Sequence, residues 1–399
     1  ADRAWGAGPT AWLAPVLWTG LEYVRCEVWW LKFTWFSAGS ALPPPWGPLT
    51  GLGVYGTGLA LALAIPLAHR WMAARRPGGW GHRLPVIAWL AALAALSPAW
   101  RPNRGAGEAG GPALAVAGVQ LEFPAVPDVL AGLDRARERY PGAPLFVLSE
   151  YTFDGPVPEP VRRWCREHRR WLVAGGKQAL TPEDTRVAGG EHRPLWRPWS
   201  PAAPGAFRNT AFVIGPDGQE VFSQAKAQPI QFFQDGLPAE RQQAWESPWG
   251  RLGIAVCYDA SYRRVMDPLV RQGAQALILP TMDVEEWGRY EHKLNARQAR
   301  LRAAEYGLPV FRLASSGPSE LLDARGRVIA AAGVPGPGEV VGGRISLPAR
   351  GSVPLDAWLA PGAALATVGT ALALGIAAVR RRLRPVAAVH ASTPRPLCS

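Results

Sequence analysis

The sequence predicts an α/β layered domain inserted between membrane-spanning helices. Two patterns in its 399 residues lead to this fold class. Four segments lack any charged side chain and approach the roughly 20 residues that a membrane-spanning helix needs: residues 4–21, 49–68, 84–100 and 357–379. Between the third and the fourth, short apolar runs alternate with amphipathic segments, which is the pattern of strands and covering helices in α/β proteins.

The four apolar segments differ in how well they suit a membrane. The second and the fourth are the clearest candidates. The first contains Pro9 and Pro15 and suits a tilted or interfacial helix as well as a spanning one. The third is short and has Pro85 and Pro98 near its ends. For each segment, a helix buried in a protein core is the alternative interpretation.

Arginine-rich segments predict the orientation of the chain in a membrane. Residues 69–83 and 380–385 are rich in arginine, and the cytoplasmic flanks of membrane helices carry an excess of Lys and Arg. The part of the chain between them is therefore expected on the outer side. The expected organisation is a membrane region at 1–100, a linker at 101–112, an outer domain at 113–346, a transmembrane helix at 357–379 and a basic cytoplasmic tail at 380–399.

The charge of the chain does not favour nucleic-acid binding. The formal net charge is +12, with 43 Lys and Arg against 31 Asp and Glu. The basic clusters lie beside apolar segments and are not interleaved with aromatic residues as in nucleic-acid-binding surfaces. The four cysteines have no metal-binding spacing, and no motif calls for a metal, a nucleotide or another cofactor. An outer location would permit a disulfide between Cys165 and Cys257, but the reactive role of Cys257 argued below disfavours it.

The outer domain is expected to begin with three strands separated by two helices. A hairpin at 209–226 follows, because Gly-Pro-Asp-Gly supplies turn chemistry between two apolar alternations. The expected strands span residues 113–122, 144–150, 171–177, 251–259, 275–281 and 309–316, and the expected helices span residues 128–140, 160–170 and 290–306.

Three reactive side chains each lie where a strand is expected to end: Glu150, Lys226 and Cys257. A rigid sheet can present such side chains to one cleft. A thiol needs a base to become a nucleophile, and an ammonium stabilises the oxyanion that forms when a carbonyl is attacked. We therefore expect Glu150 as the base, Lys226 as the oxyanion clamp and Cys257 as the nucleophile. Taken alone, each residue has a simpler interpretation as a core thiol, a solvated turn residue or a surface charge.

The order and context of these residues resemble the nitrilase superfamily of carbon–nitrogen hydrolases. The resemblance implies a four-layer αββα sandwich over residues 113–346 and a Glu–Lys–Cys triad formed by Glu150, Lys226 and Cys257. The segments that carry it are LSE (148–150), NTAFVIGPDGQEVFSQAK (209–226), GIAVCYD (253–259), LVRQGAQALILPT (269–281) and ARLRAAEYGLPVFRLASSGPSELLDARGRV (299–328).

The flanking segments narrow the resemblance. Residues 15–42, PVLWTGLEYVRCEVWWLKFTWFSAGSAL, are similar to a membrane segment of the apolipoprotein N-acyltransferase family. That family also places its nitrilase domain between a late membrane helix and one final helix. Its members have more membrane helices upstream, so we expect this chain to be N-terminally shortened or a fragment. The aromatic residues Trp29, Trp30, Phe33, Trp35 and Phe36 are expected at the outer interface. They would either line the way to Cys257 or form a plain interfacial belt without substrate contact.

The supporting residues depart from the family pattern. The family's lysine is followed by a functional glutamate, and Gln234 stands at that position with Asp235 next to it. Asp235 takes over the role if the loop is shifted by one residue, or Gln234 acts as a neutral hydrogen-bond partner. The backbone N–H near Tyr258 is expected to help hold the oxyanion. Asp259 completes a Cys-Tyr-Asp sequence that is similar to many soluble amidases.

The resemblance implies a membrane-embedded acyltransferase. It would move a phospholipid acyl chain through a Cys257 thioester to the α-amine of a lipid-modified N-terminal cysteine of apolipoproteins. The implied location is the bacterial inner membrane, with several helices in the membrane and the catalytic domain on the periplasmic side. One alternative is a membrane-anchored amidase that uses water as the acceptor. A second alternative is a non-catalytic scaffold.

Overall fold

The computed structural model describes residues 7–43, 49–73, 84–95, 112–180, 206–231, 233–336 and 338–383. Within them, the strands form two six-stranded sheets. The first sheet has the order β12 (Glu339–Ser346), β1 (Ala113–Gln120), β2 (Leu145–Leu148), β3 (Trp171–Ala179), β4 (Phe207–Ile214) and β5 (Glu220–Ala225). The second has the order β11 (Val328–Ala331), β10 (Glu320–Leu322), β9 (Val310–Leu313), β8 (Ala276–Pro280), β7 (Gly250–Ile254) and β6 (Ala244–Ser247).

Parallel strands at the centre of each sheet are joined through helices. Strands β1, β2 and β3 are parallel, as are β7, β8 and β9. Parallel neighbours need a crossover connection, and helices supply it here. The connecting helices are α5 (Val126–Arg139) and α6 (Glu159–His168) in the first half, and α8 (Arg263–Arg271) and α9 (Gly288–Tyr306) in the second.

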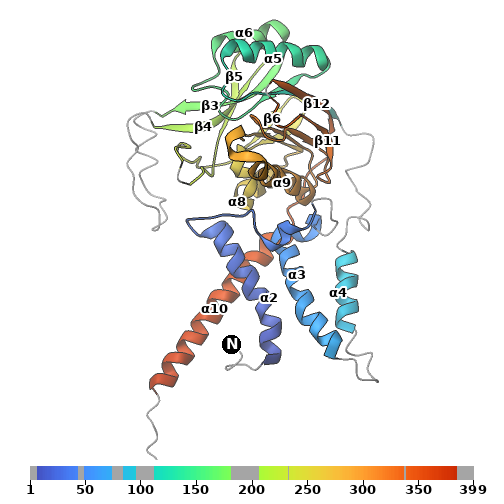
Figure 1. Cartoon of the computed structure of the whole chain (residues 1–399), viewed down its shortest axis with the longest axis vertical. Coiled ribbons are helices and arrows are strands. Elements are labelled where there is room, and N and C mark those ends of the chain that lie inside the picture. The colour runs from blue at the N-terminus through green and yellow to red at the C-terminus, as the bar shows by residue number, and fades with distance from the viewer. Residues whose placement is uncertain are drawn as a thin grey trace, which may run out of the picture.

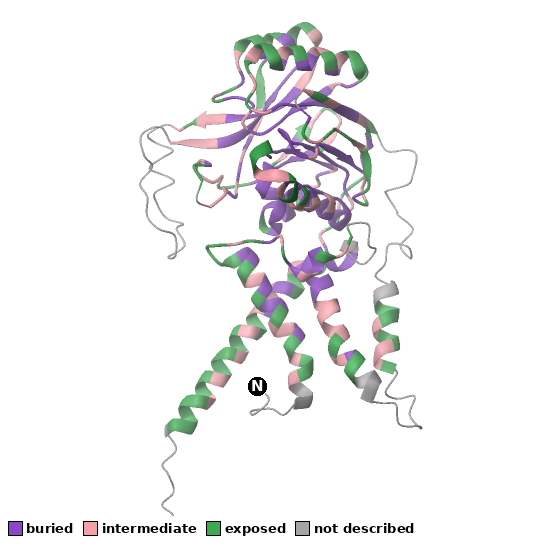
Figure 2. Ribbon diagram, in the orientation of Figure 1, coloured by how far each residue is buried: buried purple, intermediate pink, exposed green. Residues whose placement is uncertain are grey.

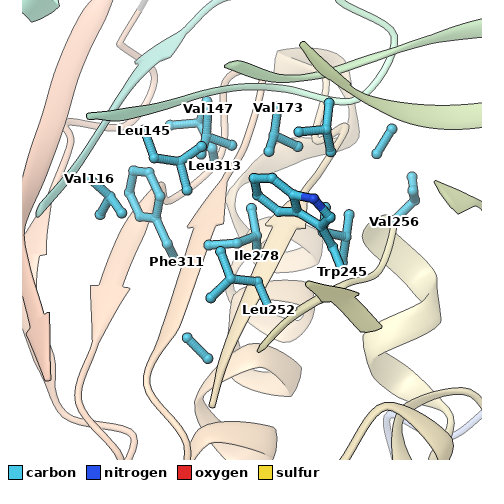
Figure 3. Close-up of a cluster of buried hydrophobic side chains, with 14 of the residues drawn as sticks. Val116, Leu145, Val147, Val173, Trp245, Leu252, Val256, Ile278, Phe311 and Leu313 are labelled. Carbon is cyan, nitrogen blue, oxygen red and sulfur yellow. The ribbon is translucent and has the colours of Figure 1, made fainter. Parts of the chain in front are cut away.

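Three apolar clusters separate four layers. One cluster packs residues of both sheets against each other, among them Val147 and Ile278 (Figure 3). A second lies between the first sheet and α5 and α6 and includes Phe146 and Trp164. A third lies between the second sheet and α8 and α9 and includes Leu277 and Met266. The central strands therefore have one face toward the other sheet and one toward helices, which gives the αββα sandwich expected from the sequence.

In the part of the chain that the structure describes, four further helices lie at one end of the sandwich, on the side of α8 and α9 (Figure 1). They are α2 (Ala7–Tyr23), α3 (Leu49–Ala73), α4 (Leu84–Ala95) and α10 (Asp356–Leu383). Within the described residues, Gly51–His69 and Asp356–Arg382 are long and apolar enough to cross a membrane. Most of α10 is exposed along its length although it is apolar (Figure 2), as a helix facing lipid would be.

The segment 24–43 connects these helices to the sandwich. It begins with a π-helical turn, η1 (Val24–Val28), and includes a short 3₁₀ helix, η2 (Ala38–Ala41). The Trp35 indole N–H donates to Ser261 Oγ at 2.9 Å, and the Tyr262 hydroxyl donates to the Lys32 carbonyl at 2.9 Å. The segment is therefore bonded to the turn that carries the expected nucleophile.

Buried charges hold α3 and α10 against the sandwich. Arg263 at the start of α8 forms an ion pair with Asp356 at the start of α10. Asp356 also accepts the Tyr55 backbone N–H at 2.9 Å, and Glu305 of α9 accepts the Val54 N–H at 2.9 Å. Breaking a buried charge pair costs about 3–5 kcal/mol, so this junction ties the apolar helices firmly to the domain.

Gly53 allows α3 to bend at this junction. Its φ of 73° lies in the left-handed region that favours glycine. A Cβ at this position would lie 2.1 Å from Asp356 Oδ1. Glycine is therefore required both by the backbone conformation and by the close approach of the carboxylate.

The strands and helices predicted for the outer domain are present with shifted ends, whereas β6 and β12 were not predicted. The strand expected over 251–259 ends at Ile254. Cys257 instead begins a 3₁₀ turn, η4 (Cys257–Ser261), because its φ of 49° cannot continue an extended strand. The expected linker at 101–112, apart from residue 112, and the tail beyond residue 383 lie outside the described residues.

Candidate active site

The structure brings Glu150 and Lys226 into direct contact. Glu150 lies in the turn after β2, and Lys226 directly follows β5. Lys226 Nζ lies 2.8 Å from Glu150 Oε1, and both side chains are 1% exposed. The remaining oxygen, Glu150 Oε2, accepts the backbone N–H of Met282 at 2.8 Å. The glutamate is therefore held from two sides and cannot easily change rotamer.

A second carboxylate completes the surroundings of the lysine. Asp235 Oδ2 lies 2.7 Å from Lys226 Nζ. The Asn209 side-chain amide bridges the two carboxylates, donating to Glu150 Oε1 at 2.5 Å and to Asp235 Oδ1 at 2.8 Å. The Tyr151 hydroxyl also donates to Asp235, at 2.8 Å. Lys226 is thus a buried cation between two anions, an arrangement that low solvent access makes strong.

These contacts shift the pKa of each charged group. Burial raises the pKa of Glu150 above its ordinary value, and Asp235 adds to this while Lys226 opposes it. Burial alone would lower the pKa of Lys226, but Glu150 and Asp235 raise it well above the usual range. Burial opposes the charge on Asp235, yet its pKa is lowered because Lys226 and the donated hydrogen bonds stabilise the anion. Lys226 is therefore a permanent cation at neutral pH.

Cys257 lies in a strained and buried turn. Its positive φ is rare for a residue with a side chain and costs of the order of 1–3 kcal/mol. The thiol donates weakly to the Met282 carbonyl at 3.7 Å, and Asn295 Nδ2 lies 3.9 Å from the sulfur. Burial raises the pKa of Cys257 well above its ordinary value, with Glu150 adding to the effect and Lys226 opposing it. The thiol is therefore protonated until a base removes its proton.

Asp259 fixes the turn relative to the loop that follows Lys226. Its carboxylate accepts the backbone N–H groups of Ala227, Gln228 and Val256 at 2.7 to 3.2 Å. Burial raises its pKa to about 6, although Lys226 and these hydrogen bonds oppose the shift. Asp259 therefore positions Cys257 and Lys226 relative to each other through the backbone.

Asp235 and Gln234, the two candidates for the supporting role after Lys226, occupy different environments. Asp235 is buried against Lys226, and its Oδ2 also accepts the Ile230 backbone N–H at 2.8 Å. Gln234 is exposed. The structure therefore brings Asp235 into the cluster and leaves Gln234 outside it.

An apolar pocket of about 510 Å³ opens beside the thiol. Tyr258, next to the nucleophile in sequence, is part of its wall and makes an edge-to-face ring contact with Trp35 at 5.9 Å between centroids. Two walls come from segments far apart in the chain, one on the side of the apolar helices and one from the loop after Lys226. The lining residues are Leu31, Lys32, Phe33, Trp35, Ile230, Gln231, Phe233, Cys257, Tyr258, Trp287, Glu291 and Asn295.

A second buried network supports the far side of the thiol. Asp283 pairs with Arg312 of β9 and accepts a hydrogen bond from Asn295 Nδ2 at 2.6 Å. Asn295 is thereby held in the orientation that directs its amide toward Cys257. Within the described residues, there is no group of three or more His, Cys, Asp or Glu side chains that could hold a metal ion.

Sequence reasoning did not find several of these residues. Asn209 stands at the start of the hairpin motif, and that position was its only signal. Asn295, Asp283 and Arg312 carry no local signal, because α9 and β9 bring them to the thiol only in the folded chain. Glu291 was likewise not singled out, although it lines the pocket.

The fold and this site define a carbon–nitrogen hydrolase. The carbon–nitrogen hydrolase family matches residues 135–353 of the chain, which is more than half of it. The protein belongs to this family, as the resemblance to the nitrilase superfamily predicted.

Among individual relatives, the chain is similar to two kinds of enzyme. It is 42% identical over 77 residues to an apolipoprotein N-acyltransferase of Rhizobium rhizogenes, covering 18% of this chain and 14% of the relative. It is 41% identical over 80 residues to the Agrobacterium fabrum enzyme of the same name, covering 19% and 14%. It is also 28% identical over 149 residues to a deaminated glutathione amidase of Synechocystis, covering 31% and 53%. The matches therefore span a small part of the acyltransferases and about half of the amidase.

Solved structures of the superfamily are similar at low identity. Nit3 of Saccharomyces cerevisiae, a member of branch 10 of the nitrilase superfamily, has a TM-score of 0.46 at 20% identity, with 59% of this chain and 90% of that chain covered. A carbon–nitrogen hydrolase of Helicobacter pylori has a TM-score of 0.46 at 16% identity, with the same coverage.

Proposed function

We propose that this protein is a membrane-attached acyltransferase that takes an acyl chain from a phospholipid and transfers it to the α-amine of a lipid-modified N-terminal cysteine. The observation that carries the proposal is the apolar pocket at Cys257. One wall, formed by Leu31, Phe33 and Trp35, belongs to the segment between the apolar helices α2 and α3. A pocket with this wall suits a hydrocarbon chain that arrives from a membrane.

The first half of the reaction forms a thioester. Glu150 accepts the thiol proton, and the Cys257 sulfur attacks the ester carbonyl of the phospholipid. Lys226 and the backbone N–H of Tyr258 hold the developing oxyanion. When the tetrahedral intermediate collapses, the carbon–oxygen bond breaks and the lysophospholipid alkoxide takes the proton from Glu150. Asp235 keeps Lys226 charged and in place throughout.

The second half releases the acyl chain to an amine. The amine nitrogen attacks the thioester carbonyl, the carbon–sulfur bond breaks, and the thiolate receives a proton through Glu150. An apolar pocket keeps water away from the thioester and so favours aminolysis over hydrolysis. This is a ping-pong sequence, in which the donor product leaves before the acceptor reacts.

The membrane attachment rests on helix composition and on charge. Two helices have the length and apolarity to span a bilayer, and α10 ends with Arg380, Arg381 and Arg382. Because cytoplasmic flanks are enriched in arginine, the proposed orientation places the sandwich on the outer side, in a bacterium the periplasm. An outer domain meets exported lipid-modified proteins.

The test is to search for the thioester directly. The purified full chain in phospholipid nanodiscs would be analysed by intact-protein mass spectrometry before and after hydroxylamine treatment. We expect a mass increase equal to one fatty acid minus water, removed by hydroxylamine and absent in Cys257→Ala. A wild-type protein that remains unmodified while folded and inserted would contradict the proposal.

A second candidate function is an amidase that uses water as acceptor. The similarity to deaminated glutathione amidase and the Cys-Tyr-Asp sequence at 257–259 favour it. Turnover of small amides without phospholipid, together with no acyl-enzyme from phospholipid, would select this function. Both functions use the same three residues, so the acyl donor and the acceptor distinguish them.

A further inference from the structure

A carboxyl group that has no part in the steps above lines the pocket at Cys257. Glu291 lies in the first turn of α9 and forms part of the pocket wall. It stands one helical turn before Asn295, whose amide is 3.9 Å from the Cys257 sulfur. Residues four apart share one face of a helix, so Glu291 and Asn295 face the same space.

One oxygen of the Glu291 carboxyl is unsatisfied in this structure. Its Oε2 atom is buried and has no hydrogen-bond partner among the described residues. A buried polar atom without a partner costs about 1–3 kcal/mol. Such an atom in a pocket next to a nucleophile indicates that a ligand supplies the missing partner.

Two charged groups act on Glu291, and a third lines the same pocket. Asp283, from the loop after β8, and Arg312 of β9 face it, but these two are paired with each other. Lys32 lines the same pocket. Burial raises the pKa of Glu291 to about 8, with Asp283 adding to the shift and Arg312 opposing it. This value holds for the pocket without a bound cation. An ammonium beside Glu291 would stabilise the carboxylate and lower its pKa, whereas a phosphate or carboxylate ligand would raise the pKa further.

We propose that Glu291 binds the ammonium group of the acceptor and accepts its proton before the amine attacks the thioester. This inference rests on the proposed acyl transfer and adds to it the residue that selects an amine over water. Neither Glu150 nor Asp235 is free for this task, because Lys226 and Asn209 engage both carboxylates.

The proton balance of the second half-reaction is then complete. The acceptor enters as R–NH₃⁺ and gives one proton to the Glu291 carboxylate. The neutral amine attacks the thioester carbon, and the new carbon–nitrogen bond forms as the carbon–sulfur bond breaks. The second amine proton passes through Glu150 to the Cys257 thiolate, which restores the thiol. Glu291 then loses its proton to solvent when the amide product leaves.

The acidity of Glu291 suits this exchange. An α-amino group has a pKa of about 7.7–8.0, close to the value of about 8 for Glu291. Proton transfer between groups of similar pKa has little uphill cost, which is the condition for effective general base catalysis. A side-chain amine such as lysine, with a pKa of about 10.4, would give up its proton less readily and is expected to be a poorer acceptor.

The experiment separates the two half-reactions in the full chain. Acyl-enzyme would be prepared in nanodiscs and then mixed either with a short peptide that begins with S-diacylglycerylcysteine or with hydroxylamine, a nucleophile that is uncharged at neutral pH. For Glu291→Gln we expect the rate of aminolysis by the peptide to fall about 100-fold, the scale of a lost general base. This loss is counted beyond any change in the rate of thioester formation. Reaction with hydroxylamine should fall much less. The rate with the peptide should also shift to higher pH, following the free amine.

Two further variants serve as controls. Glu291→Asp should recover part of the aminolysis rate, which a merely structural role would not predict. Glu286→Gln, an exposed glutamate on the same connection, should match the wild type. Equal peptide aminolysis by Glu291→Gln and wild-type acyl-enzyme would overturn the inference while the proposed function stands. If the wild-type protein forms no thioester at all, the proposed function fails first and the role of Glu291 fails with it.

Discussion

Asp235 Oδ2 lies 2.7 Å from Lys226 Nζ, on a lysine that Glu150 already contacts at 2.8 Å. The residue before it, Gln234, is exposed. The loop after Lys226 therefore offers a carboxylate to the lysine one position later than the family pattern would suggest. Charge at this contact should therefore affect both the acylation of Cys257 and the stability of the fold.

Replacing Asp235 by Asn should slow acylation of Cys257. The substitution keeps the shape of the side chain but removes one of the two anions that hold Lys226. Because a positioned charge contributes to oxyanion stabilisation, we expect a loss of about 10- to 100-fold. Single-turnover acylation followed by mass spectrometry measures it. The neighbouring change Gln234→Ala is the matched control and should have a rate close to that of the wild type. A larger defect in Gln234→Ala than in Asp235→Asn would contradict the assignment.

In a plot of acylation rate against pH, the acid limb, where the rate falls as the pH decreases, should lie above pH 4.5, the ordinary pKa of a glutamate. Burial raises the pKa of Glu150, and the base must be ionised to accept the thiol proton. The rate therefore falls as the pH decreases through this raised value. Asp235 is one cause of the shift, so Asp235→Asn should move the limb to lower pH while also lowering its plateau. A limb that stays in place in this variant would show that another group controls it.

Lys226→Arg should be nearly inactive although the charge is kept. Lys226 is 1% exposed and contacts a carboxylate on each side, and a planar guanidinium cannot occupy the space of a compact ammonium. We expect a loss of at least about 100-fold in acylation, measured by the same assay. Activity within a few-fold of wild type would exclude the lysine from the oxyanion site.

Lys226→Met should destabilise the protein in a pH-dependent way. It leaves two buried carboxylates without their cation, which costs about 3–5 kcal/mol. Loss of the lysine raises the folded-state pKa of these carboxyls above their unfolded values, so the variant gains stability as the pH falls and they become protonated. Thermal unfolding should therefore show a large deficit at pH 8 that narrows toward pH 4. A deficit of the same size at both values would point to lost packing instead.

The orientation of the chain can be tested with one added cysteine. Gln219 is exposed in the turn of the β4–β5 hairpin, whereas Cys26, Cys165 and Cys257 are buried. A membrane-impermeant thiol reagent should label Gln219→Cys on intact spheroplasts, and it should label the native Cys398 only after the membrane is opened. Labelling in the reverse order would place the catalytic domain in the cytoplasm and would remove the case for lipoprotein acylation.

The fold and the candidate reactive residues could be predicted from the sequence because both have local signals. Alternating apolar and amphipathic segments mark the strands and helices, and Glu150, Lys226 and Cys257 each stand beside a recognisable apolar run. The turn at Cys257 was not foreseen, since its left-handed backbone depends on hydrogen bonds such as that from the Val256 N–H to Asp259.

Other parts of the site depend on contacts between distant segments. The choice between Gln234 and Asp235 is decided by partners outside the loop, among them Tyr151 and Asn209. Glu291 lines the same pocket as the thiol because α9 begins beside that pocket, and no motif in the sequence indicates this. Such contacts arise from how the layers pack, which a single sequence does not display.

The hydrogen bonds from Trp35 to Ser261 and from Tyr262 to Lys32 join the segment between the apolar helices to the catalytic turn. The chain therefore does not divide cleanly into a membrane part and a catalytic part. Deleting the first hundred residues would remove the apolar helices that precede the sandwich, but it would also remove Leu31, Phe33 and Trp35 from the pocket. The remaining cleft would lie open to water on the side where the donor lipid is expected to enter. A fragment without these residues is therefore an unsuitable reagent for testing this enzyme. Its inactivity, or its hydrolysis of water-soluble amides, would reflect the missing wall of the pocket.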